Sequence, residues 1–168
     1  LAEEEAGEDV LAVIDNRFSK EEVDSKSPAS EGFAKIVVNH PDTAGASNAK
    51  FLQASALFDE GKYREADAEF EAYIAGNPKS PLRAAAALGQ AACKAALEEP
   101  DAESAYEAIR NHYTGAPEAV QATLALGRLK MAAKDATKAK ELFTVVSTNR
   151  ISQFWAFEAN KLLGRLPE

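Results

Sequence analysis

The chain contains few of the residues that usually build disulfides and metal sites. It has one cysteine and two histidines among 168 residues. A single cysteine cannot form an intramolecular disulfide, so cysteine content does not distinguish the cytoplasm from the periplasm. A zinc site needs three or four converging ligands, and His40 and His112 lie far apart in the sequence. We therefore expect no metal site and no cofactor.

Long apolar runs and clustered positive charge are also missing. No run of about 18 apolar residues occurs, which predicts no membrane span in this chain. The formal net charge is -8, without a block of five like charges. This argues against binding to nucleic acid or to anionic membranes. The start at Leu1, without an initiator Met, favours a cut, either by a protease or by a cloning decision, and is compatible with the removal of a signal or an anchor.

The common catalytic motifs are absent as well. The sequence has no Gly-x-Ser-x-Gly, no P-loop and no dinucleotide-binding fingerprint. Its acidic clusters, "EEE" at 3–5 and "EEPDAES" at 98–104, lack the order of a calcium loop and are better explained as solvated helix faces. Cys93 in "GQAACKAAL" fits a buried small apolar residue. We expect no catalytic residue, no metal-binding residue and no enzyme activity.

What the sequence does contain favours an all-α fold. Hydrophobic residues make up 46% of the chain, and many are alanine, which favours closely packed helices over β-sheets. Apolar side chains recur at helical spacing in residues 48–60 and again from Tyr63 to Ile74. Gly61, between the two segments, is suited to end the first helix in a left-handed conformation. The two segments therefore predict a helical hairpin.

The second helix of this hairpin recurs along the chain. Ala66 is followed at fixed intervals by Phe70 and Pro78. The same intervals occur at Ala29, Phe33 and Pro41, at Ala105, Ile109 and Pro117, and without the proline at Ala139 and Phe143. This alignment requires an insertion in the third copy, within "KAALEEPDAES". It predicts an N-terminal helical segment at 1–26, a partial repeat at 27–46, repeats at 47–80, 81–117 and 118–151, and a capping helix at 152–166.

The copy at 47–80 resembles the tetratricopeptide repeat family. The resemblance rests on residues that match the family's pattern of small, apolar, turn and terminal positions, namely Ala54, Leu57, Gly61, Tyr63, Ala66, Phe70 and Pro78. It implies a right-handed α-α superhelix of about three to four tetratricopeptide-like (TPR) helical hairpins. It also implies a C-terminal capping helix that turns a charged face outward.

In that family the first helices of the hairpins line a concave groove that binds extended peptides. The groove positions carried over to this sequence are Asn48, Phe51, Ser55 and Phe58, then Arg83, Gln90 and Lys94, then Gln121, Leu124, Arg128 and Met131. The three cations in this set predict an acidic or C-terminal peptide as partner. Two alternatives stay open: the cations are paired with neighbouring Glu, and Phe51 and Phe58 are core residues. The Lys and Asn that clamp chaperone C-termini are replaced by Phe51 and Ser55, so we do not expect chaperone-tail binding.

The ends of two second helices narrow the resemblance. "FAKIVVNHPDT" and "FEAYIAGNPKSP" are most similar to repeat proteins of the bacterial cell envelope, namely YfgM-like translocon subunits and lipoproteins of outer-membrane assembly. This implies a non-catalytic protein–protein interaction scaffold on the periplasmic side, anchored by a preceding segment. Two alternatives are a homo-oligomerisation domain, such as a homodimer, and an accessory domain of a larger enzyme.

Overall fold

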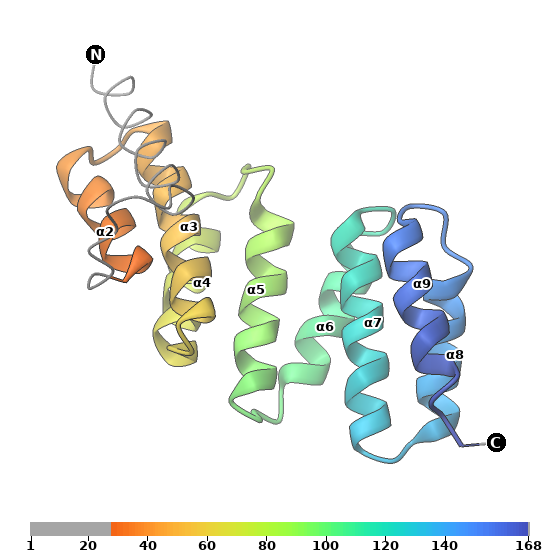
Figure 1. Ribbon diagram of the computed structural model, residues 1–168. Helices are drawn as coiled ribbons and strands as arrows, with labels where there is room; N and C mark the ends of the chain where they lie inside the picture. The colour runs from red at the N-terminus through yellow and green to blue at the C-terminus, as the bar shows by residue number, and fades with distance from the viewer. Residues whose placement is uncertain (1–27, 168) are drawn as a thin grey trace, which may run out of the picture. The chain divides into compact units, whose positions relative to one another are not determined.

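The computed structural model describes residues 28–167, and in this range the chain is entirely α-helical, as predicted. The predicted helical segment at 1–26 lies outside the described residues. No strand occurs between residues 28 and 167, and no helix there is long and apolar enough to cross a membrane. The helices are α2 (Ala29–Asn39), α3 (Ala44–Asp59), α4 (Tyr63–Gly76), α5 (Arg83–Ala96), α6 (Ala102–His112), α7 (Pro117–Ala132), α8 (Ala136–Ser147) and α9 (Gln153–Leu163) (Figure 1).

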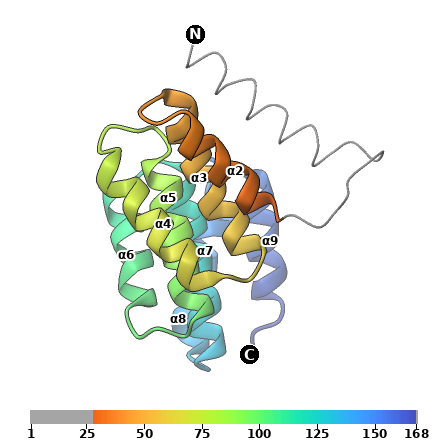
Figure 2. The ribbon, with the colours of Figure 1, turned by 90° about the vertical axis from the view of Figure 1, so that its left-hand side faces the viewer.

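The described helices fall into two compact units, which divide between Leu97 and Glu98. Within the first, α2, α3, α4 and α5 pack in sequence, and α3 also contacts α5 (Figure 2). Within the second, α6, α7, α8 and α9 pack in sequence, and α7 also contacts α9. The division between the units falls inside the predicted repeat 81–117.

A regular pattern of burial shows the true register of the repeat. Each second helix carries a small residue, then a buried large residue four positions on and another three positions further. The four sets are Ala29, Phe33 and Ile36; Ala66, Phe70 and Tyr73; Ala102, Tyr106 and Ile109; and Ala139, Phe143 and Val146. Their starting points are 37, 36 and 37 residues apart, so the chain has no insertion in the third copy.

In the third copy, the register seen in the structure is shifted by three residues from the register of the sequence alignment. Ala105, the predicted counterpart of Ala66, is only half-buried, whereas Ala102 is 5% exposed. Pro117 does not end that copy, because it occupies the first turn of α7. A proline is well tolerated there, since its missing N–H would have no partner within the helix.

The first helices follow the same spacing through fully buried alanines. Ala49, Ala86, Ala122 and Ala159 all have 0% exposure. Ala49 packs in a cluster with the two large residues of the preceding α2, and Ala159 packs in one with the two large residues of α8. A methyl group at this position lets neighbouring helices approach closely, so that the aromatic side chains fill the remaining space.

The turns from first to second helices also repeat. Gly61 has the predicted left-handed conformation, with φ of 76°. Glu98 and Lys134, 37 and 73 residues further on, have φ of 56° and 61°. The later copies therefore keep the turn without its glycine.

The last helix packs as expected on one side only. Ala159 and Leu162 of α9 are buried in a cluster with α8. Its outer surface carries Phe154 and Phe157, which are 63% and 67% exposed. The terminal helix thus presents two aromatic side chains beside the exposed Lys161 on the face that the sequence predicted to be charged.

We predict that Gly127→Ala destabilises the protein by about 1–3 kcal/mol, the usual cost of overpacking. A Cβ at Gly127 would come within 3.0 Å of the Phe143 ring, which outweighs the higher helix propensity of alanine. The matched control is Gly76→Ala, where nothing lies within 4 Å of the new Cβ. Urea unfolding measures both variants, and equal stability of the two would contradict the close packing.

We predict that Lys134→Gly stabilises the protein by up to about 1 kcal/mol, because glycine adopts positive φ without a steric cost. Lys140→Gly, at an exposed position inside α8, should instead destabilise it by about 1 kcal/mol. Thermal melts distinguish the two. A loss of stability in Lys134→Gly would show that the left-handed turn is not strained.

Candidate functional site

The first unit contains an apolar groove between two of its first helices. Its cavity measures about 260 Å³. The helices α3 and α5 form the walls, and Phe70 of α4 contributes to the lining between them. The lining residues are Phe51, Ser55, Phe58, Asp59, Phe70, Ala85, Leu88, Gly89 and Ala92. Only Asp59 carries a charge, so the groove is suited to an apolar side chain from a ligand.

Local packing of aromatic rings fixes this lining. The ring of Phe51 lies 6.0 Å from that of Phe70 and 5.7 Å from that of Tyr73, measured between centroids. The tip of the Phe70 ring occupies the space that a Cβ at Gly89 would need. Phe70 therefore leans toward α5, and the backbone of Gly89 receives it. These contacts hold the groove open without help from a ligand.

The structure brings some of the predicted groove residues together. Phe51, Ser55 and Phe58 line the cavity. Phe51 and Phe58 are half-buried. Each ring packs against α4 and also faces the cavity, so both residues belong partly to the core and partly to the groove. Asn48 is exposed on α3 outside the cavity lining.

The residues predicted on α5 do not line the cavity. Gln90 and Lys94 are half-buried elsewhere on α5. The guanidinium of Arg83 donates a hydrogen bond of 2.9 Å to the carbonyl oxygen of Ile74, at the end of α4. Arg83 thus caps a helix C-terminus, where a cation is electrostatically favoured.

The lining residues of α5 were missed because the groove positions of the third copy were taken at the wrong spacing. In the sequence alignment the third copy follows the second at a spacing of 39 residues. This spacing leads from Phe51 to Gln90 and from Ser55 to Lys94. The spacing in the structure is 37, which leads instead to Leu88 and Ala92, and both line the groove. Small residues recur in the sequence at this spacing of 37, from Ala49, Ala54 and Ala56 to Ala86, Ala91 and Cys93. This was the sequence signal that could have found the lining residues, and all six small residues are buried.

In the second unit an ion pair occupies the corresponding place. Arg128 and Glu158 stand 73 residues after Ser55 and Ala85, and Arg128 Nη2 lies 3.8 Å from Glu158 Oε2. Leu124, predicted to line a groove, is only 2% exposed, while Gln121 and Met131 are half-buried. Arg128 is therefore paired with a glutamate, which is one of the alternatives that the sequence left open.

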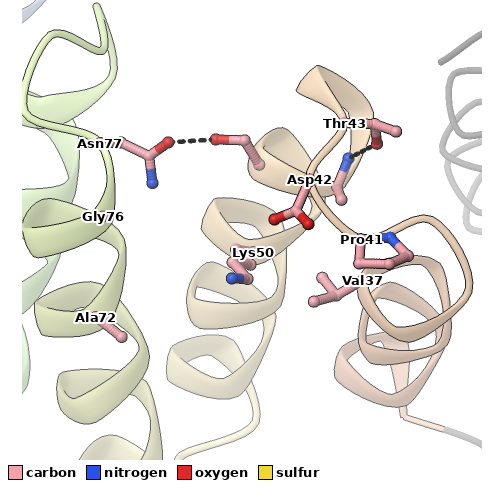
Figure 3. A pocket seen from close by; sticks show the side chains of 10 residues that line it. Val37, Pro41, Asp42, Thr43, Lys50, Ala72, Gly76 and Asn77 are labelled. Carbon is pink, nitrogen blue, oxygen red and sulfur yellow. Dashed lines mark hydrogen bonds between the residues drawn. The ribbon is translucent and has the colours of Figure 1, made fainter.

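A larger cleft of about 510 Å³ lies on another face of the first unit, between the ends of α2 and α4. Val37 and Pro41 border it on one side, Ala72 and Gly76 on the other, and Lys50 lies between them (Figure 3). A cleft of about 340 Å³ occurs at the same repeat positions of the second unit.

The side chains that line the two clefts share little chemistry. Arg110, Thr123 and Val145 stand 73 residues after Val37, Lys50 and Ala72. The clefts are thus a consequence of helix geometry, and the apolar groove is the stronger candidate site.

A charged network ties α3 to the start of α2. The carboxylate of Glu60 accepts hydrogen bonds from the N–H of Ser30 at 3.1 Å and from its hydroxyl at 2.8 Å, and it pairs with Lys62 at 3.0 Å. Burial opposes the ionisation of Glu60, but the hydrogen bonds from Ser30 and Lys62 outweigh it and lower its pKa. The network is structural, because it supplies a partner to an N–H group at the helix start.

The groups that could carry chemistry are placed unfavourably for it. Cys93 is fully buried, and burial raises the pKa of its thiol to about 12, which makes thiolate chemistry unfavourable. His112 is exposed, and its Nδ1 lies 2.8 Å from the carbonyl oxygen of Ala108. Among residues 28–167, no three His, Cys, Asp or Glu side chains converge on one point.

No family model matches the chain, and no curated protein matches its sequence.

We predict that Glu60→Gln lowers stability at neutral pH by up to about 1 kcal/mol, the usual range of such pairs. Because the folded-state pKa is lowered, the contribution of the carboxylate is present above its unfolded pKa of about 4.3 and is lost as the pH falls through the folded value. Thermal melts from pH 7 down to pH 3 should therefore show the wild type and the variant converging in acid. A difference that stays constant with pH would contradict this assignment.

Proposed function

We propose that this protein is a non-catalytic interaction scaffold whose apolar groove binds a peptide segment of a partner protein. The observation that supports the proposal is the groove itself, an apolar cavity held open by ring packing among Phe51, Phe70 and Tyr73. Apolar recesses of this kind accept the anchoring side chain of a bound segment. Among residues 28–167, Cys93 is fully buried and no three His, Cys, Asp or Glu side chains converge on one point.

The proposal includes the tetratricopeptide-like nature of the fold and a right-handed superhelix. It is supported by the hairpins, whose second helices recur at spacings of 37, 36 and 37 residues, and by the left-handed turn at Gly61. On the resemblance of its helix ends to envelope repeat proteins, we place the protein on the periplasmic side of a bacterial cell envelope. Fractionation of the source cells tests this location, and recovery in the cytosol would argue against it.

The second unit provides a design for closing the groove. The double change Ser55→Arg and Ala85→Glu introduces, at the same repeat positions, the charges of Arg128 and Glu158. Ser55 and Ala85 are both half-buried cavity-lining residues, so the new side chains have access to solvent. This variant should fill the groove and leave the helix contacts unchanged.

Random peptides displayed on phage can be selected for binding to the wild-type protein. We predict that the selected peptides bind this double variant with an affinity at least about tenfold lower than their affinity for the wild type. A tenfold loss corresponds to about 1.4 kcal/mol, which is close to the lower end of the range for burying one large apolar side chain. The matched control is Arg128→Ser with Glu158→Ala, which removes the ion pair of the second unit and should keep peptide binding.

Thermal melts verify that both double variants stay folded, and Ala92→Glu closes the same cavity by a single change. Selected peptides that bind the closed and open proteins equally well would place the binding surface elsewhere. Failure to select any groove-dependent peptide would contradict the proposed function.

A further inference from the structure

The outer face of α9 carries residues at the positions that other first helices bury against the helix that follows. Phe157 corresponds to Ser47 of α3 and Val120 of α7, at the repeat spacing. Ser47 donates a hydrogen bond of 2.7 Å to the side chain of Asn77, just after α4. Val120 is 5% exposed and packs in one cluster with Phe143 and other residues of α8. Phe157, by contrast, is 67% exposed.

A glycine at the end of α9 also occupies a position that other first helices bury. Gly164 corresponds to Ala54 of α3 and Gly127 of α7, both buried. The Phe143 ring of α8 fills the space beside Gly127 that a Cβ would need. Beside Gly164, a Cβ would meet nothing closer than a carbonyl oxygen of α9 at 3.7 Å. The small residue that receives an aromatic ring is therefore present, and its space is open.

Lys161 completes the face between these two residues. It corresponds to Phe51 and Leu124, which contact the helix that follows in their own units. Its ammonium lies 3.8 Å from the Glu158 carboxylate, so the charge has a partner within α9. The aliphatic stem of lysine can still cover an apolar surface. We call Phe154, Phe157, Lys161 and Gly164, which share one side of the helix, the α9 stripe.

We propose that the α9 stripe binds an amphipathic helix of a partner protein, packed against α9 as α8 packs against α7. The expected partner helix carries a small residue, an aromatic residue four positions on and a branched apolar residue three positions further, as in Ala139, Phe143 and Val146. The reason for this choice is continuity, because the same interface is already formed at α3 with α4 and at α7 with α8. The α9 stripe shares no residue with the groove, and the proposal does not depend on the groove's function.

The probe is a synthetic peptide that copies residues 135–148 and is held helical by a lactam bridge on its polar side. Trp155 is the only tryptophan of the chain, and its ring centroid lies 4.7 Å from that of Phe154. The peptide contains no tryptophan, so the emission of Trp155 in the intact protein reports on binding. We expect a saturable shift in this emission.

The matched variants are Gly164→Val and Phe157→Lys, each of which should weaken binding at least tenfold. Both positions are exposed, so neither change should lower the melting temperature by more than a few degrees. A peptide with Phe143→Asp should bind at least tenfold more weakly, since it lacks the ring that would pack on Gly164. Val38→Lys, at an exposed apolar residue of the first unit, should leave binding unchanged.

Two results would overturn the proposal. One is the absence of a saturable change in Trp155 emission up to about 1 mM peptide, when circular dichroism verifies that the peptide is helical. This concentration would detect even a weak complex, with a binding free energy of about 4 kcal/mol. The other is binding that Gly164→Val and Phe157→Lys both leave unchanged.

Discussion

The close approach of neighbouring helices at four buried alanines is the contact on which the rest of the structure depends. Ala49, Ala86, Ala122 and Ala159 have no exposed surface and recur within one residue of a constant spacing. A larger side chain there would separate the helices and leave the aromatic rings without packing partners. Because this spacing fixes the length of each hairpin, the turn must be tight in every copy, even where Glu98 or Lys134 has to adopt a left-handed conformation.

The helical fold and the hairpin around Gly61 could be predicted because several independent signals agree there. Apolar periodicity, a turn glycine and a terminal proline all favour the same boundaries. In the third copy these signals conflict. Ala102 and Ala105 lie one turn apart on α6, and each is followed four residues later by a large side chain, so periodicity alone fits both. Pro117 favoured the wrong choice, since a proline is compatible with the start of a helix as well as with the end of a repeat.

The error in register explains which part of the candidate site the sequence missed. The α3 wall was correct because Phe51 and Ser55 belong to the clear copy. The α5 wall consists of small and aliphatic residues, including Gly89, whose role is to admit the ring of Phe70. Such residues have no chemical signature, and only a correct register or the structure itself shows that they line a cavity. The polar neighbours Gln90 and Lys94 carry recognisable chemistry but stand on other sides of the same helix.

The two units show how one scaffold supports different surfaces. The alanine and aromatic positions are the same in both, so the backbone geometry is retained, whereas the groove positions are free to vary. In the first unit glycine is on the later helix, at Gly89, and Phe70 leans toward it. In the second unit glycine is on the earlier helix, at Gly127, and Phe143 leans the other way. Leu162 then stands where Gly89 would be and is buried, and the ion pair of Arg128 spans the remaining surface. An exchange of one glycine between helices, together with changes at several surface positions that include Arg128 and Glu158, therefore accompanies the difference between the apolar groove of the first unit and the charged surface of the second.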